Sequence, residues 1–272
     1  MEYETIQDID VPKIGLGTWR MEGSTCRNAV ATAIDLGYRH IDTAQAYGNE
    51  RQVGQAIENA AVDREEVFLT TKVWPMHRTH DAIIDSVHES LARLGTNYVD
   101  LLLIHWPNPI AATREVMSAL SDAQNDGLTR HIGVSNFDEE QLKSAQKDAE
   151  APVLTDQVQF HPYNPQRELL DYCRANDVLL TAYSPLAHGG ALHDQILTTL
   201  GKKYDKTPAQ VTLRWVIQHD GVVTIPKSTS RAHLEENLDI FDFELTETEM
   251  ELIARPSRIR TGMSMFRGRL GV

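Results

Sequence analysis

Short apolar segments alternate with amphipathic segments along the chain. Most apolar segments have the length of a β-strand, and one of them is apolar at almost every position, as in a strand buried on both faces of a parallel sheet. We predict strands at Ile14–Thr18, His40–Thr43, Val67–Val73, Val99–His105, His131–Asn136, Asp156–Phe160, Leu179–Ser184 and Val222–Lys227.

The segments between these strands carry helix signals. Ile84, Val87, Leu91 and Leu94 recur at helical spacing, and Gly95 then ends the helix. Further helix starts are indicated by capping residues at Ser24, Asp138, Thr207 and Thr246.

This alternation of strand and helix predicts a closed (β/α)8 TIM barrel rather than an open sheet. The residues before Ile14 predict a short β-hairpin over the barrel floor. Because no linker or low-complexity segment divides the chain, we expect residues 1–272 to form a single domain.

Composition restricts the partners. The formal net charge of −13 argues against a nucleic-acid surface, which needs a basic stripe. No apolar run is long enough to span a membrane, and the N-terminus lacks a secretory signal. The only cysteines, Cys26 and Cys173, lie far apart, so we expect a cytoplasmic protein.

Polar and aromatic residues follow every predicted strand, where the loops of a barrel converge on one mouth. Among them, Asp42, Tyr47, Lys72 and His105 form a set with a chemical logic. We expect the ammonium to lower the pKa of the tyrosine, the carboxylate to orient the lysine, and the imidazole to bind a substrate carbonyl. Such a set is a general acid for carbonyl reduction.

Each of these residues also has a simpler interpretation. Lys72 is compatible with a strand-end lysine, Asp42 with a helix cap, His105 with a core histidine and Tyr47 with surface packing. Their joint position at neighbouring strand ends favours the catalytic interpretation. Trp19, Trp74 and Trp106 also follow strands and predict an aromatic substrate pocket shared with Tyr47 and His105.

At these residues the chain resembles the aldo-keto reductases, similar to diketogluconate and methylglyoxal reductases. The resemblance covers nearly the whole length. It is carried by GLGTW at 15–19, GYRHIDTAQAYGNE at 37–50, TKVW at 71–74, LLIHWP at 102–107, IGVSNF at 132–137, QVQFHP at 157–162, AYSPL at 182–186 and IPKS at 225–228.

The resemblance implies a nicotinamide cofactor held across the barrel mouth. Ser135, Asn136 and Gln157 would bind its carboxamide, and Tyr183 would stack on the ring. The other residues matched to cofactor contacts are Gly17, Thr18, Asp42, Ser184, Leu186, Lys227, Ser228, Thr229, Arg231, His233, Glu236 and Asn237.

Two positions depart from the family pattern. His233 stands where an arginine commonly grips the 2′-phosphate of NADP, and a largely neutral imidazole binds phosphate more weakly. NADPH is still the preferred cofactor because Lys227 is retained, with NADH as the alternative. Asp156 replaces an asparagine often found before the glutamine, and we expect little effect.

The leading hypothesis is therefore NAD(P)H-dependent reduction of small aldehydes, α-dicarbonyls or keto-sugars by a monomer. A second hypothesis is a catalytically quiet nicotinamide-binding barrel that acts as a regulatory subunit or redox sensor. A metal-dependent hydrolase fits poorly, since His77 and His80 lack further ligands, and we expect no metal. We expect specificity to reside in loops after the fourth and seventh strands and in the tail Arg258–Val272.

Overall fold

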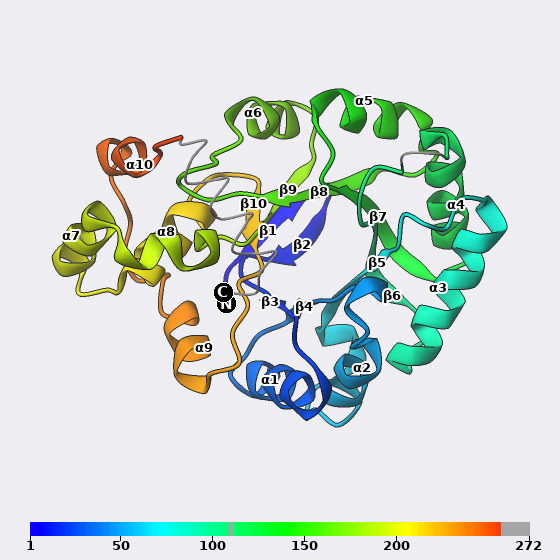
Figure 1. The fold of residues 1–272 in the computed structure, drawn as a ribbon, viewed down its shortest axis with the longest axis horizontal. Coiled ribbons are helices and arrows are strands. Elements are labelled where there is room, and N and C mark those ends of the chain that lie inside the picture. Colours follow the sequence, from blue (N-terminus) through cyan, green and yellow to red (C-terminus); the bar gives the residue numbers. More distant parts are fainter. Residues whose placement is uncertain (109–110, 257–272) are drawn as a thin grey trace.

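The protein, seen in a computed structural model that describes residues 1–108 and 111–256, is built around an eight-stranded parallel sheet ringed by helices (Figure 1). The strands follow the chain order around the sheet. They are β3 (Leu16–Gly17), β4 (His40–Asp42), β5 (Phe68–Val73), β6 (Val99–Ile104), β7 (Thr129–Ser135), β8 (Val153–Gln159), β9 (Leu179–Tyr183) and β10 (Val222–Thr224).

The first and last strands of the sheet join and close the barrel. Ile14 forms a parallel bridge with Thr224, whose carbonyl accepts a hydrogen bond of 2.7 Å from the Gly15 amide. Two residues further along the chain, the Gly17 amide donates to the Pro226 carbonyl at 3.2 Å. A Cβ at Gly17 would lie 2.6 Å from the carbonyl oxygen of Ile225, so this seam needs glycine. The predicted (β/α)8 barrel is confirmed.

Helices cover the outside of the barrel. Those between successive strands are α1 (Gly23–Asp35), α2 (Glu50–Glu58), α3 (His80–Leu94), α4 (Thr113–Asn125), α5 (Glu139–Asp148), α6 (Arg167–Ala175) and α8 (Pro208–Ile217). Helix α7 (Gln195–Tyr204) also lies between β9 and β10, whereas α9 (Arg231–Leu238) and α10 (Glu247–Ile253) follow the last strand. The 3₁₀ turns are η1 (Gln45–Tyr47), η2 (Arg64–Glu66) and η3 (Ala187–His193).

The predicted N-terminal hairpin closes the barrel floor. Strands β1 (Tyr3–Ile6) and β2 (Ile9–Pro12) pair antiparallel across one end of the barrel (Figure 1). Ile6 and Val11 are buried there and belong to one apolar cluster with Leu101, Leu103 and Leu179 from the barrel strands. This apolar plug leaves only the opposite end, at the carboxyl ends of the strands, open for chemistry.

Most predicted helix boundaries are confirmed, with three differences. Helix α1 begins at Gly23 after Glu22, so Ser24 lies inside the helix and does not cap it. Asp138, Thr207 and Thr246 each form a capping box. The loop between β9 and α8 also contains η3 and α7, which the sequence pattern did not predict. In α3 the deeply buried isoleucine is Ile83, while Ile84 is half-buried, because the buried face also takes in Ser86 and Ser90 beside Val87 and Leu91.

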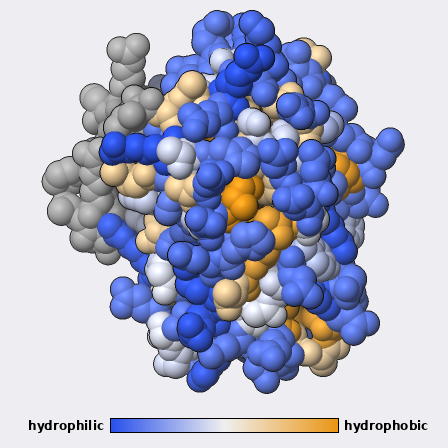
Figure 2. All heavy atoms as spheres, turned by 90° about the vertical axis from the view of Figure 1, so that its right-hand side faces the viewer, coloured by the Kyte–Doolittle hydropathy of each residue, from blue (hydrophilic) through white to orange (hydrophobic). Residues whose placement is uncertain are grey.

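The outer surface is mainly polar. Figure 2 shows a largely hydrophilic face over the helices at the right of Figure 1, with small apolar patches between polar side chains. Among residues 1–108 and 111–256, no helix combines the length and apolar character needed to cross a bilayer.

Gly54 gives a test of how closely the helices pack. A Cβ built on Gly54 of α2 would overlap the carbonyl oxygen of Leu94 at the end of α3. Because both atoms belong to backbone, we expect Gly54→Ala to lower the free energy of unfolding by about 1–3 kcal/mol in urea titrations. Gly190→Ala is the control, since its Cβ would make only ordinary contacts, the nearest at 3.7 Å. Equal stability of both variants would contradict the packing argument.

Candidate functional site

A buried ion pair forms the centre of the barrel mouth. Lys72, at the end of β5, is fully buried, and its Nζ lies 2.6 Å from Oδ1 of Asp42 at the end of β4. The same ammonium donates to the carbonyl of Thr43 at 2.9 Å. Asp42 Oδ2 accepts a hydrogen bond of 2.7 Å from the side-chain amide of Gln157 on β8. Both carboxylate oxygens are thus occupied, which a buried charge requires.

Tyr47 points its hydroxyl toward this pair. It lies at the end of η1, and Lys72 Nζ is 3.3 Å from its Oη. Burial raises the pKa of Tyr47 well above its ordinary value, and the negative charge of Asp42 acts in the same direction. Our expectation that Lys72 gives the phenol a lowered pKa is therefore wrong for this structure. The ammonium is already neutralised by Asp42, so desolvation decides the direction.

His105 follows β6 and lies beside Tyr47. The ring centroids of the two side chains are 5.5 Å apart and nearly perpendicular. Burial, and then the charge of Lys72, lower the pKa of His105 to about 3, so the imidazole is neutral at physiological pH. Its Nδ1 is buried without a hydrogen-bond partner in the described residues. A neutral imidazole next to a phenol can donate a hydrogen bond to a substrate oxygen.

A second hydrogen-bonded group lies on the β7, β8 and β9 side of the mouth. The Asn136 amide donates to the His105 carbonyl and to Ser135 Oγ, both at 3.0 Å. Its Oδ1 accepts from the Tyr183 hydroxyl at 2.8 Å, and Ser135 Oγ donates to the Gln157 carbonyl at 2.7 Å. Asn136 has a positive φ of 63°, which these contacts hold in place.

Three tryptophans lie around the mouth with large exposed fractions. Trp19 is 38% exposed, Trp74 40% and Trp106 47%, whereas Trp215 is fully buried in the core. The ring centroids of Trp74 and His105 are 5.9 Å apart, and those of Trp19 and His188 in η3 are 6.1 Å apart. Exposed indoles at this level of the barrel offer apolar surface to a ligand, although the Arg20 guanidinium lies over the Trp19 ring, 4.4 Å from its centroid.

The remaining cofactor candidates lie in the segments that follow β9 and β10. Ser184, with a φ of 50°, and Leu186 are half-buried in the loop after β9. Lys227 and Thr229 are exposed, and Ser228 is buried, in the segment that leads to α9. On α9, Arg231 pairs with Glu235 at 3.0 Å. His233 is exposed there, Glu236 is half-buried and Asn237 is buried.

Gly17 and Thr18, also predicted to contact the cofactor, lie at the carboxyl end of β3 next to Asp42. Both are buried, and the Thr18 hydroxyl and amide donate to the Asp42 carbonyl at 2.9 and 3.0 Å. Their contact with the site therefore runs through the backbone of Asp42. Within the described residues there is no cluster of side chains that could hold a metal ion.

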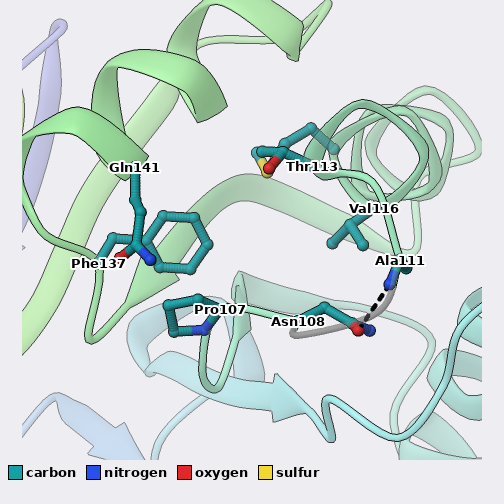
Figure 3. A pocket seen from close by; sticks show the side chains of 8 residues that line it. Pro107, Asn108, Ala111, Thr113, Val116, Phe137 and Gln141 are labelled. Carbon is teal, nitrogen blue, oxygen red and sulfur yellow. Dashed lines mark hydrogen bonds between the residues drawn. The ribbon is translucent and has the colours of Figure 1, made fainter.

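A small cavity lies beside the aromatic mouth. Its volume is about 80 Å³, and it is enclosed by the segment after β6, the start of α4 and the loop after β7 (Figure 3). The Asn108 side chain bridges this wall, accepting from the Ala111 amide at 2.9 Å and donating to the Pro75 carbonyl at 2.9 Å. The cavity is lined by Pro107, Asn108, Ala111, Thr113, Val116, Met117, Phe137 and Gln141. The tail Arg258–Val272 lies outside the described residues.

Asp156 is a feature whose importance the sequence pattern did not reveal. It precedes Gln157 on β8 and is fully buried, and no charged side chain pairs with its carboxyl group among the described residues. The backbone amide of Phe137 is the hydrogen-bonding group that acts on this carboxyl, and it lowers the pKa by less than burial raises it. Burial raises the pKa of Asp156 well above its ordinary value. We expected little effect from a carboxyl at this position, but its ionised form carries a larger desolvation cost than the neutral amide of an asparagine would.

The site residues fit a nicotinamide cofactor. The Gln157 amide contacts the ion pair, and the Asn136 amide is hydrogen-bonded to the half-buried Tyr183. Lys227 is an exposed cation at the edge of the mouth and makes no ion pair within the described part of the chain. A free ammonium there, in a protein with a net charge of −13, is suited to a phosphate group.

Comparisons with known proteins agree with this arrangement. A family model described as the aldo/keto reductase family matches residues 13–257. Glyoxal reductase of Bacillus subtilis is 44% identical over 246 residues, covering 90% of this chain and 88% of that protein. Methylglyoxal reductase DkgB of Salmonella typhi is 41% identical over 247 residues, covering 90% and 92%.

Solved structures show the same fold. The crystal structure of a putative 2,5-diketo-D-gluconic acid reductase B matches with a TM-score of 0.91 and 43% identity, covering 93% of this chain and 91% of that one. An aldo-keto reductase crystallised with NADPH matches with a TM-score of 0.87 and 33% identity, covering 93% and 86%. The resemblance inferred from the motifs is confirmed.

The buried carboxyl of Asp156 predicts how the stability of the protein depends on pH. An unfolded aspartate has a pKa of about 3.9, and the folded value is higher, so the folded protein loses stability as pH rises through that window. Asp156→Asn removes the titrating proton. We expect a higher melting temperature than wild type at pH 7, with each 1 kcal/mol worth about 2–4 °C, and a smaller difference near pH 4.

Asp100→Asn is the matched control. Asp100 is equally deep but fully paired, with Arg64 at 2.8 Å, Arg130 at 3.1 Å and the Leu69 amide at 3.0 Å. Its neutralisation breaks ion pairs and is expected to lower the melting temperature at pH 7. A loss of stability in Asp156→Asn at pH 7 would show that this carboxyl is ionised and paired.

Proposed function

This chain belongs to the aldo/keto reductase family and is an oxidoreductase that acts on carbonyl groups. From this premise we propose that it reduces small aldehydes and α-dicarbonyls to alcohols, with Tyr47 as the proton donor. The observation that carries the proposal is the 3.3 Å distance between the Tyr47 hydroxyl and a fully buried ammonium. The names of the similar glyoxal and methylglyoxal reductases support α-dicarbonyls as the first substrates to test.

Each residue of the set has a defined task. A bound dihydronicotinamide supplies hydride to the carbonyl carbon. The Tyr47 hydroxyl gives its proton to the carbonyl oxygen, and the phenolate that remains is stabilised by Lys72 at 3.3 Å. Asp42 keeps Lys72 charged and in place at 2.6 Å. His105, neutral and beside Tyr47, orients the same oxygen by donating a hydrogen bond.

The raised pKa of Tyr47 favours the reductive direction. A phenol with a pKa above 10 stays protonated at neutral pH, which is the state that can donate a proton. The reverse reaction, alcohol oxidation, needs the phenolate as base and is therefore expected to require strongly alkaline conditions.

Ser135, Asn136 and Gln157 would hold the carboxamide, with Tyr183 against the ring. Ser184 and Leu186 would run along the pyrophosphate. Lys227 and the start of α9 would hold the adenosine end. We propose NADPH as the preferred cofactor because Lys227 is exposed and unpaired in the described residues, and NADH as the alternative.

Trp19, Trp74 and Trp106 would contact the substrate, and the cavity behind Pro107 lies in one of the loops proposed to set specificity. Monomeric state and cytoplasmic location stay predictions.

Replacing the proton donor tests the mechanism. Tyr47→Phe removes only the hydroxyl, and we expect kcat for methylglyoxal reduction to fall by about 10²–10⁴-fold, the usual contribution of a general acid. NADPH binding, followed by fluorescence titration, should be nearly unchanged. Tyr172→Phe, which loses a hydroxyl bonded to Gln146 on the outer helices, is the control expected to keep wild-type activity. Full activity in Tyr47→Phe would exclude this residue as the acid.

The cofactor preference is tested at His233. An arginine at this exposed position on α9 would add a charged, bidentate donor toward a 2′-phosphate. We expect His233→Arg to lower KM for NADPH by about tenfold or more, a charged hydrogen bond being worth about 1.5–3 kcal/mol, while KM for NADH stays constant.

His88→Arg is the control for this experiment. His88 is exposed on α3, far along the chain from α9, so it adds the same charge without a ligand nearby. A fall in KM for NADPH in both variants would point to long-range attraction, and no change in His233→Arg would place the 2′-phosphate elsewhere.

A further inference from the structure

The side chain of Gln45 connects three elements behind the mouth. Gln45 opens the short turn η1 that ends at Tyr47. Its Oε1 accepts a hydrogen bond of 2.8 Å from the backbone amide of Trp74, the first residue after β5. Its Nε2 lies 3.0 Å from the Ser86 carbonyl, 3.1 Å from Ser86 Oγ and 3.0 Å from Ser90 Oγ on the inner face of α3. One amide thus fixes the turn, the strand exit and the helix to one another.

The contact with Trp74 is the one that reaches the pocket. Trp74 lies just beyond the last residue of β5, so its amide has no partner in the barrel ladder, and Gln45 supplies one. The Trp74 indole is 40% exposed, so side-chain packing does not hold it on all sides. Its ring packs edge-on against the His105 ring, with the two ring centroids 5.9 Å apart. The position of this wall therefore depends on where the backbone at residue 74 is held.

The helix side of the amide is itself firmly anchored. Ser90 Oγ also accepts from Arg93 Nη2 at 3.1 Å, and Arg93 Nε pairs with Glu50 Oε2 at 2.7 Å. Glu50 Oε1 accepts from the hydroxyl of Thr71 at 2.6 Å, one residue before Lys72. These hydrogen bonds and the ion pair form a polar layer that begins at Trp74, passes through α3 and Glu50 of α2, and returns to β5 at Thr71. Gln45 is the link in this layer nearest the mouth.

We propose that Gln45 is a positioning residue that sets the carbonyl pocket by holding Trp74 against His105. It acts through Trp74 and touches neither substrate nor cofactor. The proposal rests on the proposed function, because the pocket is that of the carbonyl substrate. Loss of the amide would free the wall formed by Trp74 while leaving Lys72, Asp42 and their partners in place, since none of these bonds to Gln45.

Two substitutions separate the acceptor from the donors. Gln45→Met keeps length and flexibility but removes every hydrogen bond. Gln45→Glu keeps an acceptor toward the Trp74 amide and weakens the contacts with Ser86 and Ser90. Gln210→Met is the matched control, because the Gln210 side chain also joins several groups through its amide, here Thr207 and Asp239, away from the barrel mouth.

The first measurement does not depend on activity. In protein labelled with 5-fluorotryptophan, the fluorine resonance of Trp74 is assigned by its loss in Trp74→Phe. We expect that resonance to shift and broaden in Gln45→Met, to change less in Gln45→Glu, and to stay at the wild-type position in Gln210→Met. An unchanged Trp74 resonance in Gln45→Met overturns the proposal. This measurement also works if wild type fails to oxidise NADPH with methylglyoxal, a result that would count against the proposed function instead.

The second measurement is steady-state kinetics at saturating NADPH. In Gln45→Met we expect KM for methylglyoxal to rise by about tenfold, as for the loss of one net hydrogen bond, with kcat and KM for NADPH within about twofold. Gln45→Glu is expected to recover part of the affinity. An equal rise of KM in Gln210→Met, or a fall of kcat in Gln45→Met with KM unchanged, would assign Gln45 a general structural role and overturn the proposal.

Discussion

The architecture of the mouth depends on one buried ion pair. Lys72 and Asp42 have side-chain exposures of 0% and 2%, and removing either partner would leave a bare charge in the barrel, at a cost of about 3–5 kcal/mol. The buried pair is tolerated because its other hydrogen-bonding groups also have partners. The ammonium also donates to the Thr43 carbonyl, and Gln157 occupies the second carboxylate oxygen. These contacts join β4, β5 and β8 across the barrel interior.

The same pairing explains why the phenol stays protonated. An isolated ammonium at 3.3 Å would favour the phenolate, but Asp42 lies still closer to that ammonium and cancels most of its field at Tyr47. Desolvation then raises the pKa of Tyr47 and lowers that of His105 to about 3. The site therefore holds a neutral phenol and a neutral imidazole around a neutralised charge pair. Its charge separation arises only when a proton leaves Tyr47, which is where the ammonium becomes useful.

The fold could be predicted from local sequence patterns, whereas much of the hydrogen-bond network of the site could not. Apolar runs and capping boxes identified the barrel and most of its helices because these signals act within a few residues. The bond between Gln157 and Asp42 spans 115 positions, and that between Gln45 and Ser86 spans 41. Such contacts depend on how strands and helices are rotated, as does the exchange of Ile84 for Ile83 at the core of α3. The burial of Asp156 without a charged partner likewise depends on which side chains the neighbouring elements place around it.

Five of the ten non-glycine residues with positive φ in the described part of the chain lie where the barrel meets the mouth. Arg20, Asn136, Ser184, Ala187 and His188 have positive φ, and all lie in the segments after β3, β7 and β9. Left-handed backbone at such residues costs about 1–3 kcal/mol each and persists only where the surroundings compensate. For Asn136 the compensation is visible, since its amide bonds to His105, Ser135 and Tyr183. A rigid, plugged barrel supplies the stability that allows these loops to hold side chains in unfavourable but well-defined orientations.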